Sequence, residues 1–190
     1  MAEPHSAGDS DSALAAAASR GCRDAFAELL ERHYDRLFAF AWRLTGSQHE
    51  AEDVTHDICV ALPRKLASYD GRAAFSTWLY RVAVNATHDR RRRQSAHLRA
   101  ASGWGEWEQQ RLDEDRHGEG DQQSTDLHWL QQAMARLPDD LRETVALVLG
   151  EGLSQAQTAE VLEISPGTVS WRMSEVKRRL RELSQTEERS

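Results

Sequence analysis

The chain has 190 residues and a formal net charge of −7, with 29% charged and 7% aromatic residues. This length can bury one good hydrophobic core or two small ones. The sequence contains no run of about 18 apolar residues, so no membrane-spanning helix is expected. Its two cysteines, Cys22 and Cys59, lie far apart and outside any CxxC pattern, and they are expected to be reduced thiols.

The first 21 residues have acidic residues before a short alanine run and no basic segment. A secretory signal would begin with basic residues, so this stretch is a poor signal peptide. We therefore predict a disordered N-terminal tail over residues 1–21.

Residues 22–93 have helical periodicity. Apolar side chains recur every three or four residues in DAFAELLERHYDRLFAFAWRL, and this helix is expected to end at Thr45-Gly46. Ser47, with Glu50 three residues later, predicts a capping box for a second helix, which Pro63 should break or kink. A third helix is predicted over FSTWLYRVAVNATHDRRRR, after the turn SYDGR.

Periodicity is lost from residue 94 to residue 126, where the sequence is polar, acidic and glycine-bearing. This composition is typical of a flexible linker, although Trp104 and Trp107 are unusual in a passive one. Residues 127–184 are helical again, and residues 185–190 form a short C-terminal tail. We therefore predict an all-α protein of two small helical domains joined by a flexible acidic linker.

The stretch LSQAQTAEVLEISPGTVSWRMSEVKRRL, residues 153–180, contains two helical patterns separated by three residues. Ser154 with Gln157 should cap the first helix, and Ser165 with Pro166 should begin the second. This spacing fits a helix-turn-helix that binds DNA. The alternative is a plain helical hairpin with a solvated basic end.

A second candidate site is TWLYRVAVNATHDRRRR, in which aromatic residues, arginines and an amide alternate. Such groups suit single-stranded nucleic acid, because bases stack on aromatic rings and phosphates pair with cations. Thr77, Trp78, Arg81, Asn85 and His88 are predicted to lie largely off the core face. The alternative is that Trp78 is buried and the arginines only solvate a helix end.

A third pattern, EAEDVTHD, places Glu50, Asp53 and Asp57 on one acidic stripe flanked by His49 and His56. A metal site is conceivable, but an acidic strip facing solvent or a partner fits better, because no cluster of three defined ligands emerges. The sequence shows no nucleophile–base pair, glycine-rich phosphate loop or HExxH motif. It therefore predicts a protein that is not an enzyme and has no cofactor.

Taken together, these stretches resemble the extracytoplasmic-function (ECF) sigma factors of bacterial RNA polymerase. The resemblance covers residues 22–93, which correspond to sigma region 2, and residues 130–184, within the predicted region 4 domain at 127–184. It is carried by AFAELLERHYDRLFAFAWRLTG, EAEDVTHD, YDGRAAFSTWLYRVAVNATHDRRRR and LPDDLRETVALVLGEGLSQAQTAEVLEISPGTVSWRMSEVKRRLREL, in this order and across an acidic linker.

The resemblance implies three binding surfaces. Polymerase, through its β′ clamp helices, would bind Glu52, Asp53, His56 and Asp57. The minus-ten element, captured as flipped single-stranded bases, would meet Tyr69, Asp70, Arg72, Phe75, Thr77, Trp78, Arg81, Asn85, His88 and Arg92. The minus-thirty-five duplex would meet Ser165, Pro166, Thr168, Ser170, Trp171, Arg172, Ser174, Glu175, Lys177 and Arg178.

The implied partners are core RNA polymerase, including its β flap, promoter DNA and an anti-sigma factor. The implied location is the cytoplasm, including sequestration at the inner membrane by a membrane-bound anti-sigma factor. An acidic chain suits this function because polymerase supplies most of the basic surface that DNA binding requires. Extruding bases costs a few kcal/mol, which contacts in the binding pocket must offset.

The sequence departs from the family at three places. Pro63 stands where an aromatic residue is frequent, Glu163 where the turn often has glycine, and Ser170-Trp171 where a basic residue and serine are usual. An atypical minus-thirty-five preference is therefore expected. Two rival hypotheses are a free-standing helix-turn-helix dimer and a metal-dependent nuclease that uses the His and Asp residues near 49–57.

Overall fold

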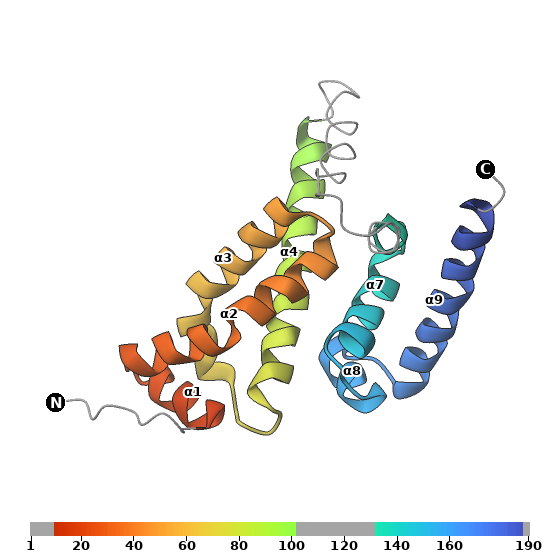
Figure 1. Cartoon of the computed structure of the whole chain (residues 1–190). Coiled ribbons are helices and arrows are strands. Elements are labelled where there is room, and N and C mark those ends of the chain that lie inside the picture. The colour runs from red at the N-terminus through yellow and green to blue at the C-terminus, as the bar shows by residue number, and fades with distance from the viewer. Residues whose placement is uncertain (1–9, 102–131, 188–190) are drawn as a thin grey trace.

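The computed structural model describes residues 10–101 and 132–187, in which every regular element is a helix (Figure 1). An N-terminal bundle comprises α1 (Asp11–Ser19), α2 (Arg23–Thr45), α3 (Gln48–Lys65), the short η1 (Leu66–Ser68) and α4 (Phe75–Ala101). A C-terminal domain comprises α7 (Asp139–Val145), the π-helical turn η3 (Ala146–Gly150), α8 (Gln155–Leu162) and α9 (Pro166–Glu187). The predicted all-α class and two helical domains are confirmed.

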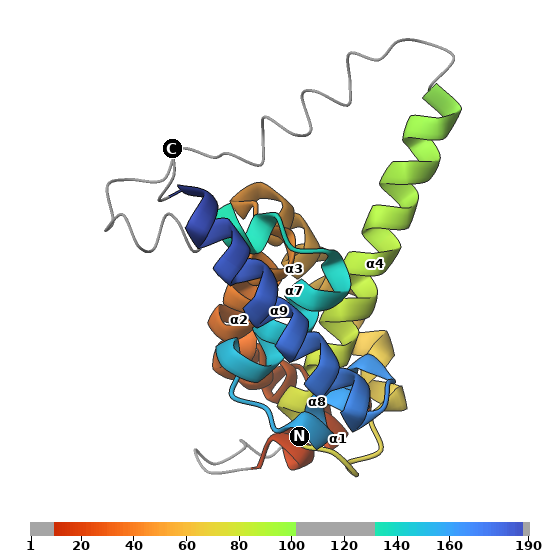
Figure 2. The same ribbon diagram turned by 90° about the vertical axis from the view of Figure 1, so that its right-hand side faces the viewer.

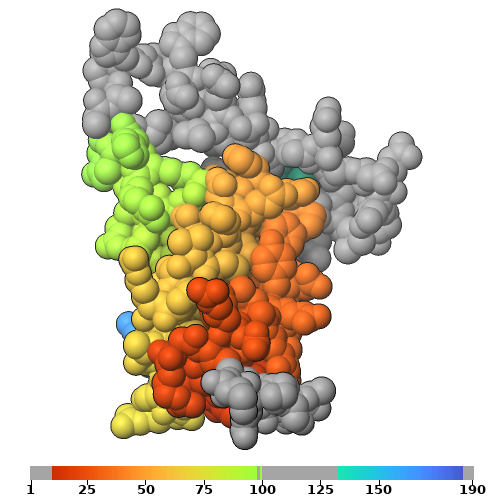
Figure 3. Space-filling model, turned by 90° about the vertical axis from the view of Figure 1, so that its left-hand side faces the viewer, coloured from red at the N-terminus to blue at the C-terminus, as the bar shows by residue number. Residues whose placement is uncertain are grey.

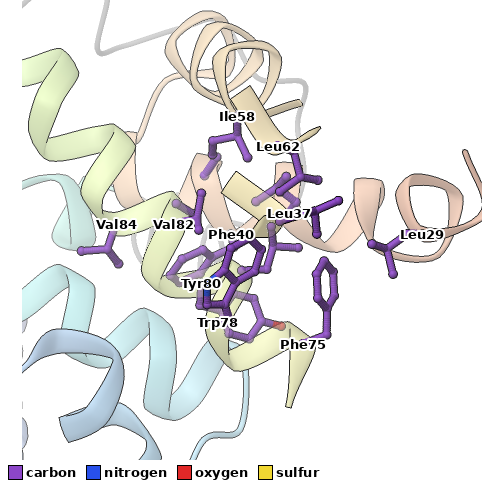
Figure 4. Close-up of a cluster of buried hydrophobic side chains, with 14 of the residues drawn as sticks. Leu29, Leu37, Phe40, Ile58, Leu62, Phe75, Trp78, Tyr80, Val82 and Val84 are labelled. Carbon is purple, nitrogen blue, oxygen red and sulfur yellow. The ribbon is translucent and has the colours of Figure 1, made fainter. Parts of the chain in front are cut away.

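The core of the N-terminal bundle lies where α2, α3 and α4 meet (Figure 4). Phe40 of α2 is fully buried against Tyr80 of α4, with ring centroids 4.9 Å apart. Leu37, Ile58 and Leu62 fill the space around this pair. Burial of a large apolar side chain contributes about 1.5–3 kcal/mol, so these residues hold the three helices together.

The first helix, α1, corrects the prediction of a disordered tail over residues 1–21. Ser10 caps this helix by accepting a hydrogen bond from the Ala13 amide, and Leu14 and Ala15 are buried against the bundle. The small alanine side chains let α1 approach α2 closely, but the sequence alone did not show which surface they would cover. Residues 1–9 lie outside the described part of the chain.

Several predicted helix ends are confirmed. Gly46 ends α2 with a left-handed φ of 74°, and the Ser47 hydroxyl accepts a hydrogen bond from the Glu50 amide at the start of α3. Ser154 and Gln157 form the reciprocal capping box of α8, and the Ser165 hydroxyl accepts from the Thr168 amide at the start of α9. These caps satisfy backbone amides that the first helical turn leaves unpaired.

Two predicted boundaries are wrong. Of the break or kink predicted at Pro63, the break does not occur, because α3 continues to Lys65 before the chain tightens into η1. The proline lies in the last turn, where its missing amide removes only one hydrogen bond near a helix end. The helix α4 continues to Ala101, beyond the predicted start of the linker at residue 94. The remaining linker, with Trp104 and Trp107, lies outside the described residues.

Glu163 occupies the turn between α8 and α9 with φ 56° and ψ 40°, in the left-handed region. A residue with a Cβ atom is strained there by roughly 1–2 kcal/mol, whereas glycine is not. We therefore expect Glu163→Gly to raise the free energy of unfolding by about 1 kcal/mol, measured by urea denaturation. The matched control is Glu160→Gly, which lies exposed inside α8 and should lower it by about 1 kcal/mol. Equal effects of the two changes would show that backbone strain at Glu163 is unimportant.

The two domains pack against each other. Leu147 of η3 and Val161 of α8 join the buried apolar cluster of the N-terminal bundle, and α8 lies along α4. Figure 4 shows Val84 on the side of α4 that faces the C-terminal domain. Figure 2 shows the far end of α4 extending beyond the bundle.

Arg142 of α7 stabilises this packing from a buried position. Its guanidinium donates to the carbonyl of Leu44 at 3.1 Å, and to those of Met134, Ala135 and Leu137 at 2.8–3.0 Å. The Leu44 carbonyl also accepts from Arg91 of α4 at 2.8 Å. Positive charge at the C-terminal end of α2 is favourable because the helix dipole is negative there.

Candidate nucleic-acid interface

The loop between η1 and α4 presents a small exposed polar surface. Asp70 and Arg72 are exposed, and the Asp70 carboxylate accepts from the Arg72 amide at 3.1 Å and pairs with its guanidinium at 3.3 Å. Gly71 between them has a φ of 73°, which favours glycine, although a Cβ atom at this position would meet no neighbouring atom. The backbone and two charged groups of this loop are therefore available to a ligand.

The residues at the start of α4 support this loop from inside. Phe75, Thr77 and Trp78 are all buried, and Figure 4 shows Phe75 and Trp78 among the core side chains. The prediction that Thr77 and Trp78 lie off the core face is wrong, because the C-terminal domain and the Tyr69 ring cover that side of α4. Phe75, also in the set implied to meet the minus-ten element, is 2% exposed and belongs to the core.

Further along α4, the predicted DNA-contacting side chains face the C-terminal domain. Arg81 pairs with Glu163 at 3.6 Å, and His88 contacts the Glu143 carboxylate at 2.6 Å. Asn85 and His88 line an interdomain cavity of about 350 Å³ whose opposite wall includes Asp139 and Asp140. Arg92 remains exposed and pairs with Asp89 in its own helix. In this arrangement, acidic groups of the C-terminal domain occupy the cationic side of α4.

Glu143 is the buried member of this contact. Desolvation raises the pKa of its carboxyl group, while His88 and Arg91 act in the opposite direction. Arg91 also pairs with Asp139 at 2.9 Å. The partners on α4 therefore favour the charged form of a carboxyl group whose pKa burial raises.

The strongest polar contact between the domains is centred on Glu151, whose side chain is only 1% exposed. Its carboxylate accepts from Arg36 at 2.8 Å, from Arg43 at 2.5 Å and from the Tyr80 hydroxyl at 2.5 Å. Burial, followed by this hydrogen bond, raises the pKa of Tyr80, so its hydroxyl remains a donor. Sequence reasoning missed Glu151, because an acid in the turn sequence GEG gives no local sign of burial.

The acidic stripe of α3 lies on a different face of the bundle. Figure 3 shows α1, α2 and α3 spread across this face, with almost none of the C-terminal domain in view. Glu52, His56 and Asp57 are exposed. Asp53 is half-buried and pairs with Arg90 of α4, which also approaches Asp57 at 3.8 Å. The arginines of α4 thus pair with Asp53 and Asp57 of the stripe. The neighbouring Glu52 is exposed, and its carboxylate accepts a hydrogen bond from the Gln48 side chain.

In the described ranges, no three His, Cys, Asp or Glu side chains gather closely enough to bind a metal ion. His49 lies 3.8 Å from Asp53 and is otherwise exposed. The histidines beside the stripe therefore form no metal site with the described residues. None of the described helices is long and apolar enough to cross a membrane.

The second helix of the helix-turn-helix, α9, exposes part of its predicted reading face. Ser170, Ser174 and Lys177 are exposed, and Trp171 is 62% exposed. Ser165, Pro166 and Thr168 form its start, where the two hydroxyls lie 2.9 Å apart.

Three members of the predicted set on α9, Arg172, Glu175 and Arg178, are engaged in contacts within the protein. Arg172 points toward α7 and donates to the Asp140 carbonyl at 3.3 Å. The carboxylate of Glu175 accepts from Arg178 at 2.6 Å and from Arg179 at 2.9 Å, and these bonds lower its pKa to about 2. Glu175 is therefore an ionised acceptor whose charge is already paired within the helix.

The fold and its helix-turn-helix place the chain in the Sigma-70 class of transcription factors. Residues 29–97 match Sigma-70 region 2, and residues 127–180 match Sigma-70 region 4. The chain is 31% identical to the ECF RNA polymerase sigma factor SigW of Bacillus subtilis, over 85% of this chain and 90% of SigW. It is 34% identical to the ECF sigma factor SigM of Mycobacterium tuberculosis, over 92% of this chain and 84% of SigM.

Two solved structures share the fold. One is the sigma factor RpoE in complex with the anti-sigma factor NepR from Bartonella quintana, with a TM-score of 0.69, 23% identity, and coverage of 84% of this chain and 96% of that one. The other is CnrH in complex with the cytosolic domain of CnrY, with a TM-score of 0.64, 24% identity, and coverage of 94% and 99%. The chain belongs to the ECF sigma factors, which direct RNA polymerase to promoters and initiate transcription.

Proposed function

We propose that this sigma factor divides its task among three surfaces. The exposed acids of α3 bind the clamp helices of the polymerase β′ subunit. The loop at residues 70–74 and the cationic side of α4 capture the minus-ten strand, and α9 enters the minus-thirty-five major groove. The protein performs no covalent chemistry and acts in the cytoplasm. The observation that carries this proposal is that the α3 stripe, the loop and the outer face of α9 are separately exposed on one chain.

The packing between the domains supports a closed state that opens on polymerase. Arg81 and His88 are paired with acids of the C-terminal domain, so a DNA strand would have to displace those acids. The minus-ten and minus-thirty-five elements are separate segments of the promoter, whereas α4 of the first domain and α8 of the second are in direct contact. The domains must therefore separate to read both elements, and an anti-sigma factor that favours the closed state would keep the protein inactive.

The α3 surface can be tested with a charge reversal at Glu52. We expect Glu52→Lys to weaken binding to core polymerase at least about tenfold, because a like charge facing a basic partner is repelled. Fluorescence anisotropy of labelled protein titrated with core enzyme measures this affinity. The control is Glu31→Lys on α2, which makes the same charge change at another exposed position. Equal losses in both variants would mean that overall charge, and not the α3 stripe, drives polymerase binding.

A further inference from the structure

We propose that α1 is part of the promoter-opening apparatus, with Ser12 and Tyr69 as positioning residues for the loop at 70–74. Helix α1 lies before residue 29, where the match to Sigma-70 region 2 begins. Figure 1 shows α1 and the loop that follows η1 at the same end of the bundle. The inference rests on the proposed function of this loop in capturing the minus-ten strand.

A chain of hydroxyl groups connects α1 to the far end of the loop. The Tyr69 hydroxyl donates to the Ala73 carbonyl at 2.9 Å. The side chain just before the loop thus holds the loop backbone four residues later. The Ser12 hydroxyl lies 3.0 Å from the same Tyr69 oxygen. Because the single proton of Tyr69 is directed to Ala73, Ser12 is the donor in this second bond. Ser12 thereby fixes the position and direction of the Tyr69 hydroxyl.

The ring of Tyr69 is held equally firmly. Its centroid lies 5.5 Å from those of Phe75 and Trp78, and the contact with Phe75 is edge-to-face at 87°. Phe75 in turn meets the ring of His33 at 5.0 Å, and His33 contacts the Asp11 carboxylate at 2.8 Å. Asp11 and Ser12 are consecutive residues at the start of α1. Two sets of contacts therefore connect the start of α1 to Tyr69. One is the hydrogen bond from Ser12, and the other runs from Asp11 through His33 and Phe75.

Tyr69 is half-buried and its hydroxyl is engaged on both sides, whereas Asp70, Gly71 and Arg72 are exposed. We therefore infer that the exposed residues contact the strand and that Tyr69 holds the shape of the loop, a role different from the base contact that the family resemblance implies for Tyr69. A loop held in its binding shape loses less conformational freedom when it captures a strand. Helix α1 is a suitable anchor because Leu14 and Ala15 fix it in the core.

The test compares two serines of the same helix. Ser12→Ala removes the bond to Tyr69, whereas Ser19→Ala removes only a bond within α1, from Ser19 to the Ala16 carbonyl. Tyr69→Phe keeps the ring and removes the hydrogen bonds of its hydroxyl to Ser12 and Ala73. Ser12→Thr keeps a hydroxyl at position 12, in contrast to Ser12→Ala. Each full-length variant is assembled with core polymerase on a promoter fragment. The promoter is identified by sequencing the transcripts that appear when the protein is overproduced. The measurements are core affinity, melting temperature and strand opening, followed by a fluorescent base in the minus-ten element.

We expect Ser12→Ala to reduce strand opening about three- to tenfold and Tyr69→Phe about tenfold or more, in line with one and two lost hydrogen bonds. Core affinity should stay at the wild-type value, and the melting temperature should fall by no more than a few degrees, because each lost hydrogen bond contributes about 1 kcal/mol. Ser19→Ala and Ser12→Thr should open DNA normally. Normal opening by Ser12→Ala would overturn the inference. A fall in its melting temperature or core affinity that accounts for the loss would also overturn it.

A separate variant distinguishes failure of this inference from failure of the proposed loop function. Asp70→Ala combined with Arg72→Ala alters only exposed side chains of the loop. If this double variant opens DNA normally, the loop does not capture the strand, and both proposals fail. If it is defective while Ser12→Ala is normal, the loop function stands and only the role of α1 is refuted.

Discussion

Replacing both Arg36 and Arg43 by alanine is expected to separate the two domains of this sigma factor. These arginines are the cationic partners of the buried Glu151 carboxylate, and their loss leaves it with the Tyr80 hydroxyl as its remaining side-chain donor among the contacts described above. An uncompensated buried charge costs about 3–5 kcal/mol. Opening the interface returns Glu151 to water and avoids this cost. Small-angle scattering should show a larger radius of gyration, and urea denaturation should show reduced stability.

The matched control is the double variant Arg64→Ala/Lys65→Ala, which removes two exposed positive charges at the end of α3. It should remain compact and lose no more than about 1 kcal/mol. Glu151→Gln should be milder than the arginine pair, because it removes the buried charge while the amide can still accept a hydrogen bond from Tyr80. An arginine double variant as compact and stable as the wild type would show that Glu151 does not hold the domains together.

Arg142→Met is expected to lower the free energy of unfolding by about 3 kcal/mol or more. The change keeps much of the side-chain volume but removes the guanidinium that donates to four backbone carbonyls. Buried acceptors without donors cost about 1–3 kcal/mol each, although some of them can reach water when the site relaxes. Chemical denaturation followed by circular dichroism measures the loss.

Two further substitutions show whether the loss of stability is specific to the guanidinium of Arg142. Arg136→Met changes the same residue type at an exposed position nearby and should alter stability by less than about 0.5 kcal/mol. Arg142→Lys keeps the charge but not the planar fork of donors, and it should be intermediate. If Arg142→Met were no worse than Arg136→Met, the carbonyl cluster would not depend on Arg142.

The features that could be predicted from the sequence are those governed by neighbouring residues. Gly46 ends α2, Ser154 and Gln157 cap α8, and Ser165 begins α9 because capping involves groups within one helical turn. Glu163 is singled out by the sequence because related proteins often have glycine at this turn, and its backbone is indeed left-handed. Interactions between neighbouring residues therefore predict the helices and their order along the chain.

The errors and omissions involve partners that are distant in sequence. The sequence predicts a tail in place of α1 because an alanine run shows no strong amphipathic pattern, whereas packing against α2, η1, α3 and α4 stabilises the helix. Trp78 was placed off the core because its cover comes from Tyr69 and the C-terminal domain. Glu151 and Arg142 bind groups about 70 to 115 positions away, and no local pattern identifies such partners.

The net negative charge of the chain fits the packing of the two domains against each other. It also fits promoter binding that depends on polymerase. Glu143, Glu151 and Glu163 of region 4 pair with basic side chains of region 2. The cationic side of α4 is thus balanced within the chain itself. Arg81 and His88 pair with acids of the C-terminal domain until the domains separate, which agrees with a factor that depends on polymerase for promoter binding.

Core-dependent transcription tests the central claim most directly. Purified chain is added to core RNA polymerase on promoter fragments identified by sequencing the transcripts that appear on its overproduction. The account predicts specific initiation that requires both components, with weak binding of the chain alone to the same duplex in a gel-shift assay. Failure to bind core polymerase, or tight specific duplex binding by the chain alone, would contradict it.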